Sequence, residues 1–78
     1  MDTTLENLIA LLADKAVVDP SDVSLESQFI LLGLDSLDLV ELVMDVEEQF
    51  EISLPEAYEI PTAATVDQLY QAILAAQS

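Results

Sequence analysis

The 78 residues suffice for one small domain with a modest core, and 53% of them are hydrophobic, which is too many for a disordered acidic tail. Sixteen acidic residues against a single basic one give a formal net charge of −15, which argues against nucleic acid and favours partners with basic patches. The chain has no cysteine and no histidine, so a disulfide framework, a zinc cluster and the usual proton-transfer residue are missing.

The sequence predicts no membrane insertion. Its apolar runs fall short of the ~18 residues needed to cross a bilayer, and its N-terminus lacks the basic start and apolar stretch of a signal peptide. We therefore expect a cytoplasmic protein, although an organellar protein that has lost its transit peptide would look the same.

The first predicted helix begins at a capping-box pattern formed by Thr3 and Glu6. It should end near residues 17–18, because Pro20 disfavours helical geometry at the residue before it. Apolar residues at helical spacing mark its inner face, namely Leu5, Leu8, Ile9, Leu12 and Ala16.

A long loop is predicted from about Asp19 to Asp35, and Ser21 and Asp22 could cap a single turn within it. Loops of this length in a compact domain are uncommon and usually functional. Four apolar residues should pin the loop onto the helices, namely Leu25, Phe29, Leu31 and Leu32.

The second predicted helix runs from about Ser36 to Phe50 or Glu51 and carries two stripes. One is apolar and should face the core, with Leu39, Leu42, Val43, Val46 and Phe50. The other is part apolar and part acidic, with Leu37, Val40, Glu41, Met44, Glu47 and Glu48. A helix that serves only its own core needs one apolar face, so the second stripe indicates a docking surface. The alternative is that these are scattered apolar surface residues, which are common.

Two further helices are predicted near the end of the chain. Pro55 should start a short helix of one or two turns that ends before Pro61. Thr65 should cap a last helix that runs to about Ala76. The inner face of this last helix would consist of Val66, Leu69, Tyr70, Ile73 and Leu74.

The junction between the long loop and the second helix carries the main chemical signal. Gly33 can adopt backbone shapes that other residues resist, and Asp35 is a preferred N-cap. Ser36 then falls on the first helical residue, where a phosphate ester would face the positive end of the helix. Taken alone, such a short motif is more often a capped helix start than a modification site.

Residues on both sides extend this motif to Phe29-x-x-Leu32-Gly33-x-Asp35-Ser36-Leu37-Asp38-x-Val40-Glu41-Leu42. The pattern continues through Val43-Met44-x-x-Glu47-Glu48-x-Phe50 and Leu54-Pro55, and ends at Thr65-Val66. The combined pattern resembles the phosphopantetheine attachment region of acyl carrier proteins over nearly the whole chain. Residues 59–64 depart from the family, since this segment is longer than usual and contains an additional proline.

The resemblance implies an all-α fold with a single acyl carrier domain over residues 1–78. The expected architecture is a four-helix bundle with three main helices, a short third helix and a long loop between the first two. The family further implies a 4′-phosphopantetheine arm on Ser36 that carries acyl groups as thioesters in fatty acid, polyketide or related assembly. A phosphopantetheinyl transferase would attach this arm from coenzyme A, while Asp35 helps to hold magnesium.

The same resemblance implies that acyl-loading, elongating and acyl-transferring enzymes dock on the second helix through basic patches. The expected docking residues are Leu37, Asp38, Val40, Glu41, Met44, Glu47 and Glu48. We expect the protein to be a monomer.

The sequence also indicates that this protein is not itself an enzyme. Ser36 has no visible base or oxyanion machinery, and the spacing of a calcium-binding loop is absent, so we expect no tightly bound metal. Two alternatives stay open at this point, namely a carrier with an aminoacyl or peptidyl load and an unmodified acidic helical adaptor.

Overall fold

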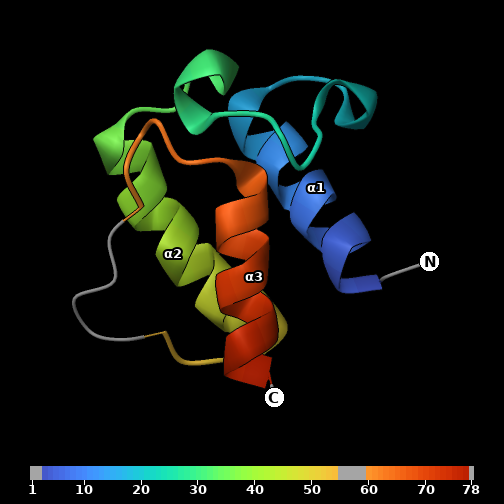
Figure 1. The fold of residues 1–78 in the computed structure, drawn as a ribbon, viewed down its shortest axis with the longest axis vertical. Coiled ribbons are helices and arrows are strands. Elements are labelled where there is room, and N and C mark those ends of the chain that lie inside the picture. Colours follow the sequence, from blue (N-terminus) through green and yellow to red (C-terminus); the bar gives the residue numbers. More distant parts are fainter. Residues whose placement is uncertain (1–2, 55–59, 78) are drawn as a thin grey trace.

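The computed structural model describes residues 3–54 and 60–77, which form a bundle of three α-helices (Figure 1). These helices are α1 (Thr3–Ala16), α2 (Ser36–Phe50) and α3 (Val66–Gln77), with two 3-10 helices, η1 (Pro20–Asp22) and η2 (Phe29–Leu32), between α1 and α2. The predicted all-α class and its three main helices are confirmed. The short helix predicted from Pro55 to Glu59 lies outside the described residues.

Two of the predicted caps differ from the structure. Thr3 is the first residue of α1 rather than its cap. In the long loop, Asp19 caps η1 in place of Ser21 or Asp22, because its Oδ1 accepts a hydrogen bond from the Ser21 N–H at 2.9 Å. This bond and a second one from the Ser21 hydroxyl lower the pKa of the Asp19 carboxyl, since both favour its charged form.

The core is built from the inner stripes of the three helices and from apolar anchors in the loops. In α2, Leu39, Leu42 and Val46 are buried as predicted, while Val43 and Phe50 are half-buried against them. All the buried side chains among the described residues are apolar, so the acidic groups stay at the surface. The full set is Leu8, Leu12, Ala13, Val23, Phe29, Leu34, Leu39, Leu42, Val46, Leu54, Ala64, Val66, Leu69 and Ile73.

The long loop is anchored by three of the four residues predicted to pin it. Phe29 is completely buried, and Leu25 and Leu32 pack half-buried against the core. The prediction for Leu31 is wrong, since its side chain is 77% exposed. A 3-10 helix repeats every three residues, so Phe29 and Leu32 share the inner side of η2 while Ile30 and Leu31 point outward.

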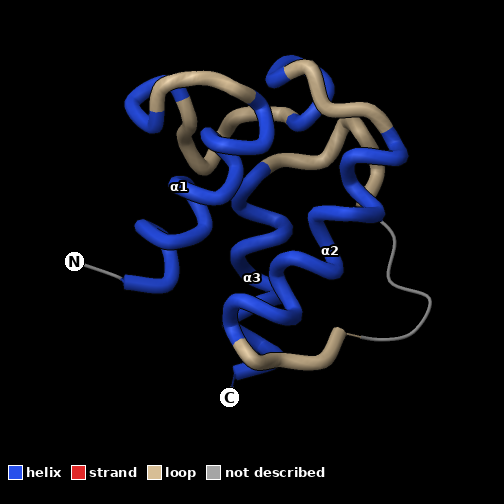
Figure 2. The backbone as a smooth tube through the Cα atoms, turned by 180° about the vertical axis from the view of Figure 1, so that it is seen from behind, coloured by secondary structure: helices blue, strands red, loops and turns tan. Residues whose placement is uncertain are grey.

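Residues 25–30 of this loop lie beside residues 62–67, which lead into α3, at the end of the bundle where the loops gather (Figure 2). The first two N–H groups of α3 have no acceptor within their own helix and donate to loop carbonyls instead. Four backbone hydrogen bonds join the two segments, namely Asp67 N to Leu25 O (2.9 Å), Val66 N to Ser27 O (2.9 Å), Phe29 N to Ala64 O (3.1 Å) and Ile30 N to Thr62 O (2.8 Å).

The helices of the described residues do not combine the length and hydropathy required to cross a membrane.

α1 ends in a strained turn at Val17, whose φ of 57° lies in the left-handed region. The Val18 N–H donates to the Ala13 carbonyl at 2.9 Å, which closes the last turn in a geometry that usually employs glycine. A β-branched residue is rare in this region because its Cβ approaches the following carbonyl. The Val17 side chain is 89% exposed, so packing of this side chain does little to offset the backbone strain.

We expect Val17→Gly to raise the free energy of unfolding by about 0.5–1 kcal/mol, because relief of left-handed strain outweighs the extra chain entropy of glycine. For a domain of this size the melting temperature should rise by about 2–8 °C in a thermal melt. Val17→Ala is the matched control, since it shortens the same exposed side chain but keeps Cβ. A glycine variant that melts no higher than the alanine variant would contradict the assignment of strain.

Candidate functional site

Ser36 lies at the start of α2, in a turn that is anchored on both sides. Gly33 ends η2 with a φ of 85°, a conformation that side-chain-bearing residues rarely adopt. Leu34 before the serine and Leu39 after it are both buried, so the chain is anchored on either side. Ser36 itself is exposed and is the first residue of the helix.

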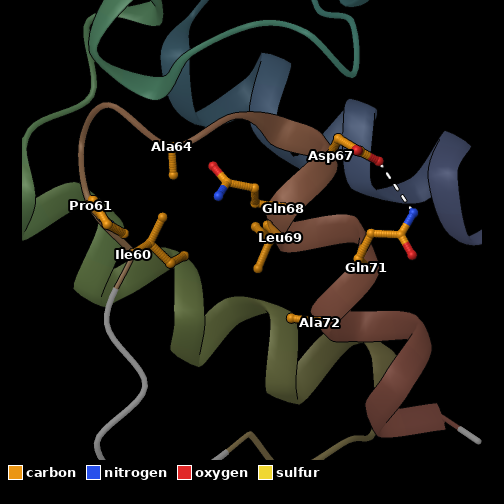
Figure 3. A pocket seen from close by; sticks show the side chains of 8 residues that line it. All are labelled: Ile60, Pro61, Ala64, Asp67, Gln68, Leu69, Gln71 and Ala72. Carbon is orange, nitrogen blue, oxygen red and sulfur yellow. Dashed lines mark hydrogen bonds between the residues drawn. The ribbon is translucent and has the colours of Figure 1, made fainter.

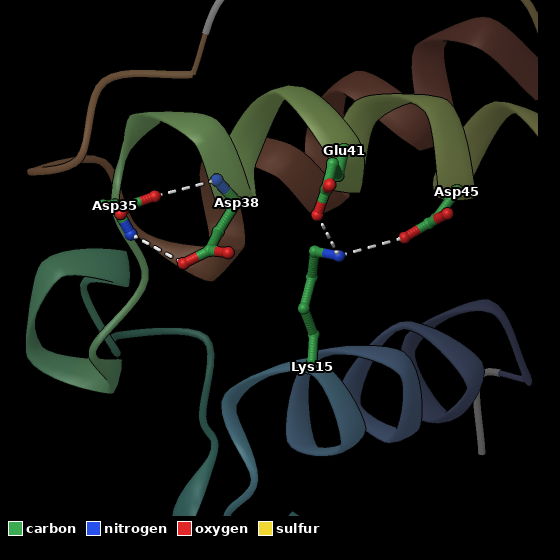
Figure 4. Close-up of polar contacts among 5 residues, drawn as sticks. All are labelled: Lys15, Asp35, Asp38, Glu41 and Asp45. Atoms are coloured by element: carbon green, nitrogen blue, oxygen red, sulfur yellow. Dashed lines mark hydrogen bonds and ion pairs between the residues drawn. The ribbon is translucent and has the colours of Figure 1, made fainter.

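Asp35 and Asp38 form a reciprocal capping box around this serine (Figure 4). Asp35 Oδ1 accepts from the Asp38 N–H at 3.0 Å, and Asp38 Oδ2 accepts from the Asp35 N–H at 3.1 Å. Each carboxylate thus satisfies a backbone donor at the helix start and places negative charge at the positive end of the helix dipole. The predicted cap is confirmed, and the partnership of Asp38 in it adds rigidity to the turn.

The predicted second stripe of α2 is exposed along its apolar centre. Leu37, Val40 and Met44 are 74%, 59% and 56% exposed. Ile30 and Leu31, in the 3-10 helix that ends just before this turn, are also exposed. Sequence reasoning missed these two, and the signal that identifies them is the three-residue period of η2 between Phe29 and Leu32.

The carboxylates of this stripe differ in what they contact. Glu47 Oε2 accepts from the Leu54 N–H at 2.9 Å and so fixes the segment that follows α2. Glu41 faces α1, where Lys15 Nζ lies 3.5 Å from its Oε2. Glu48 has no hydrogen bond or ion pair to another described residue, which leaves its charge available at the surface.

Lys15, the single basic residue of the chain, also pairs with Asp45, at 3.3 Å from Nζ to Oδ2 (Figure 4). Partial burial lowers the pKa of the ammonium, but hydrogen bonds and charge from Asp45 and then Glu41 raise it, and the net shift is upward. The ion pairs therefore stabilise the fold while Lys15 is protonated, and this stabilisation is lost as the pH rises through the raised pKa of the lysine. Sequence reasoning did not identify Lys15 or Asp45, although Glu41 and Asp45 are like charges four residues apart on a helix, an arrangement that a counter-charge stabilises.

Comparison with known proteins adds two findings to this geometry. The family model described as a phosphopantetheine attachment site matches residues 6–73. The acyl carrier protein of Clostridium acetobutylicum is 44% identical over 52 residues, which cover 65% of this chain and 68% of that protein.

The chain belongs to the acyl carrier protein family. Its prosthetic group is 4′-phosphopantetheine, and its role is that of a carrier rather than an enzyme. Membership in this family implies interaction with a phosphopantetheinyl transferase and with acyl-processing enzymes. In the part of the chain that the structure describes, histidine, cysteine and carboxylate side chains do not gather in a group that could hold a metal ion.

A half-open cavity of about 500 Å³ lies between the segment before α3 and α3 itself (Figure 3). Ile60, Leu69 and Ala72 give it apolar walls. Its polar residues are engaged within the fold, since Gln68 Oε1 accepts from the Thr65 N–H at 2.9 Å and Gln71 Nε2 donates to Asp67 Oδ1 at 3.3 Å. The free surface of the cavity is therefore mainly apolar.

We expect the two faces of α2 to respond differently to truncation. Leu42→Ala should lower the free energy of unfolding by about 2–5 kcal/mol, because it opens a cavity in the core. Met44→Ala removes a side chain that is more than half exposed and should change it by less than about 1 kcal/mol. Chemical denaturation of both variants measures the difference. Equal losses of stability in the two variants would mean that the exposed face is assigned wrongly.

Proposed function

We propose that Ser36 carries the 4′-phosphopantetheine arm and that residues 1–78 work as a single acyl carrier domain. The observation that carries this proposal is that Ser36 is the first residue of a capped helix and has an exposed hydroxyl without a hydrogen bond to another described residue. The hydroxyls of Ser21, Ser24 and Ser27 are engaged in hydrogen bonds instead. Ser36 is thus exposed, unpaired and rigidly placed at the start of a long helix.

The start of α2 fits a phosphodiester on this serine. The N–H groups of Ser36 and Leu37 have no acceptor among the described residues, whereas that of Asp38 is taken by the cap. Free N–H groups at the positive end of a helix stabilise a phosphate. Asp35 would help to hold magnesium during arm transfer through Oδ2, because its Oδ1 caps the helix.

The chain supplies the placement of the arm and lacks the reactive sulfur. The arm's terminal thiol holds acyl groups as thioesters, which stores them in activated form. The fixed turn around Ser36 sets the point from which this arm reaches docked enzymes, and the tether raises the effective concentration of the acyl group at their active sites. We assign the load to fatty acid, polyketide or related acyl assembly.

An acyl load is favoured over an aminoacyl or peptidyl load by the name of the Clostridium relative and by the apolar walls of the cavity beside α3. Intact mass of the protein isolated from its own cells distinguishes these loads. The cytoplasmic location and the monomeric state expected from the sequence stay predictions.

We assign enzyme docking to the exposed stripe of α2 around Leu37, Val40 and Met44. Methionine adapts its shape to different partner surfaces, which suits a carrier that serves several enzymes. Glu48 provides unpaired charge that steers basic patches toward this stripe. The remaining acidic docking residues, Asp38, Glu41 and Glu47, flank the apolar centre and also contact their own fold.

Ser36→Ala should fold as the wild type does and gain no arm when incubated with coenzyme A, magnesium and a phosphopantetheinyl transferase. Intact mass and peptide mapping measure the modification. Ser53→Ala is the matched control, because Ser53 is also exposed and its hydroxyl has no partner among the described residues. An arm mapped to Ser53, Ser21, Ser24 or Ser27 would end the assignment.

Glu48→Lys should slow arm transfer at low salt, roughly three- to tenfold, because charge reversal at a steered surface mainly reduces association. The defect should shrink at higher ionic strength as salt screens the field. Glu6→Lys in the first turn of α1 makes the same change of charge away from α2 and serves as the control. Equal effects of the two variants would show that net charge, and not the stripe, governs transfer.

A further inference from the structure

The chain neutralises part of its own docking helix. Lys15 reaches from α1 to Glu41 and Asp45, which lie one turn apart on the flank of α2 that faces α1 (Figure 4). The lysine side chain is only 17% exposed, while those of Glu41 and Asp45 are 64% and 45% exposed. The cation is thus fixed between the helices, and the carboxylates that it contacts remain open to solvent.

Glu48 continues the acidic row of Glu41 and Asp45 by a further turn of α2, and no cation among the described residues pairs with it. A groove of about 520 Å³ next to the ion pairs is lined by Leu11, Asp45, Glu48 and Gln49. The two ends of the row therefore differ. A basic side chain that approaches Glu48 meets an unpaired carboxylate, whereas one that approaches Glu41 meets a carboxylate that already has a counter-ion.

We infer that Lys15 determines which carboxylates of α2 partner enzymes can use, because its charge partly neutralises Glu41 and Asp45 and so weakens their attraction for a partner's basic side chain. This inference rests on the proposed docking surface. A basic side chain gains less by pairing with Glu41 than by pairing with Glu48, since Lys15 already pairs with Glu41 and repels a second cation. Partner enzymes then first contact Glu48 and the apolar centre of the stripe. Lys15 acts as a positioning residue through the two carboxylates that it contacts.

Lys15→Met is the direct test, because methionine keeps an apolar stem between the helices and removes the charge. With apo-protein, coenzyme A and a phosphopantetheinyl transferase at low salt, KM for the carrier should fall about two- to fivefold, the range that an exposed ion pair supports, with kcat unchanged. Lys15→Arg should keep the wild-type KM. A purely structural role would leave KM unchanged or raise it, while thermal melts report any loss of stability.

Asn7→Asp is the matched control, since it makes the net charge more negative by one unit at an exposed position of α1 without touching the ion pairs. A Lys15→Met effect no larger than that of Asn7→Asp overturns the inference. The second arm repeats Lys15→Met in a background with Glu41→Gln and Asp45→Asn. The fall in KM should vanish there, because the carboxylates that Lys15 releases are gone.

Persistence of the fall in KM in that background also overturns the inference. The proposed docking surface is tested separately in the same assay by Glu48→Lys. If Glu48→Lys slows transfer while Lys15→Met does not lower KM, the docking surface stands and the role of Lys15 is wrong. If Glu48→Lys has no more effect than Glu6→Lys, both proposals fall.

Discussion

The hydrogen-bonded pairing of residues 25–30 with residues 62–67 is the constraint on which the position of Ser36 depends. A loop of this length would otherwise lose much conformational entropy on ordering with little return. The backbone hydrogen bonds to the entry of α3 and the complete burial of Phe29 provide the stabilisation that offsets this loss of entropy. Because η2 begins within the paired segment and leads through Gly33 to Asp35, the pairing with the entry of α3 positions the start of α2, although the two are far apart in sequence.

Electrostatic imbalance is the second constraint. With 16 acidic residues and one basic residue, the compact state repels itself, and ordinary salt-bridge networks cannot form. The described acidic residues relieve this in other ways. Asp35, Asp38 and Glu47 accept hydrogen bonds from backbone N–H groups, and Lys15 is shared between two carboxylates. The negative charge is thus kept at the surface, where local backbone contacts and one shared lysine stabilise part of it.

Helical spacing predicted most of the inner faces of the helices, because burial of an apolar stripe is a local sequence pattern. It wrongly included Leu5 and Leu74, which do not pack against the described core, and it missed the buried Ala13. The cap at Asp35 was predictable from residue preference, because aspartate is favoured at the N-cap. Leu31 was misplaced because a 3-10 turn changes the period from 3.6 to 3 residues over only four positions. The pairing of Lys15 with Glu41 and Asp45 depends on how α1 crosses α2, and the left-handed turn at Val17 depends on where the chain must reverse, so neither has a local signature.

Because basic residues are so scarce in this chain, cleavage by trypsin can report local unfolding at a single place. Trypsin cleaves after lysine and arginine, so in these 78 residues its single internal target is the bond that follows Lys15. That bond lies in the last turn of α1, and the lysine is held against α2. Proteolysis requires a segment to leave its helix, so the rate at which one chain becomes two fragments measures how often the end of α1 comes away from its neighbour.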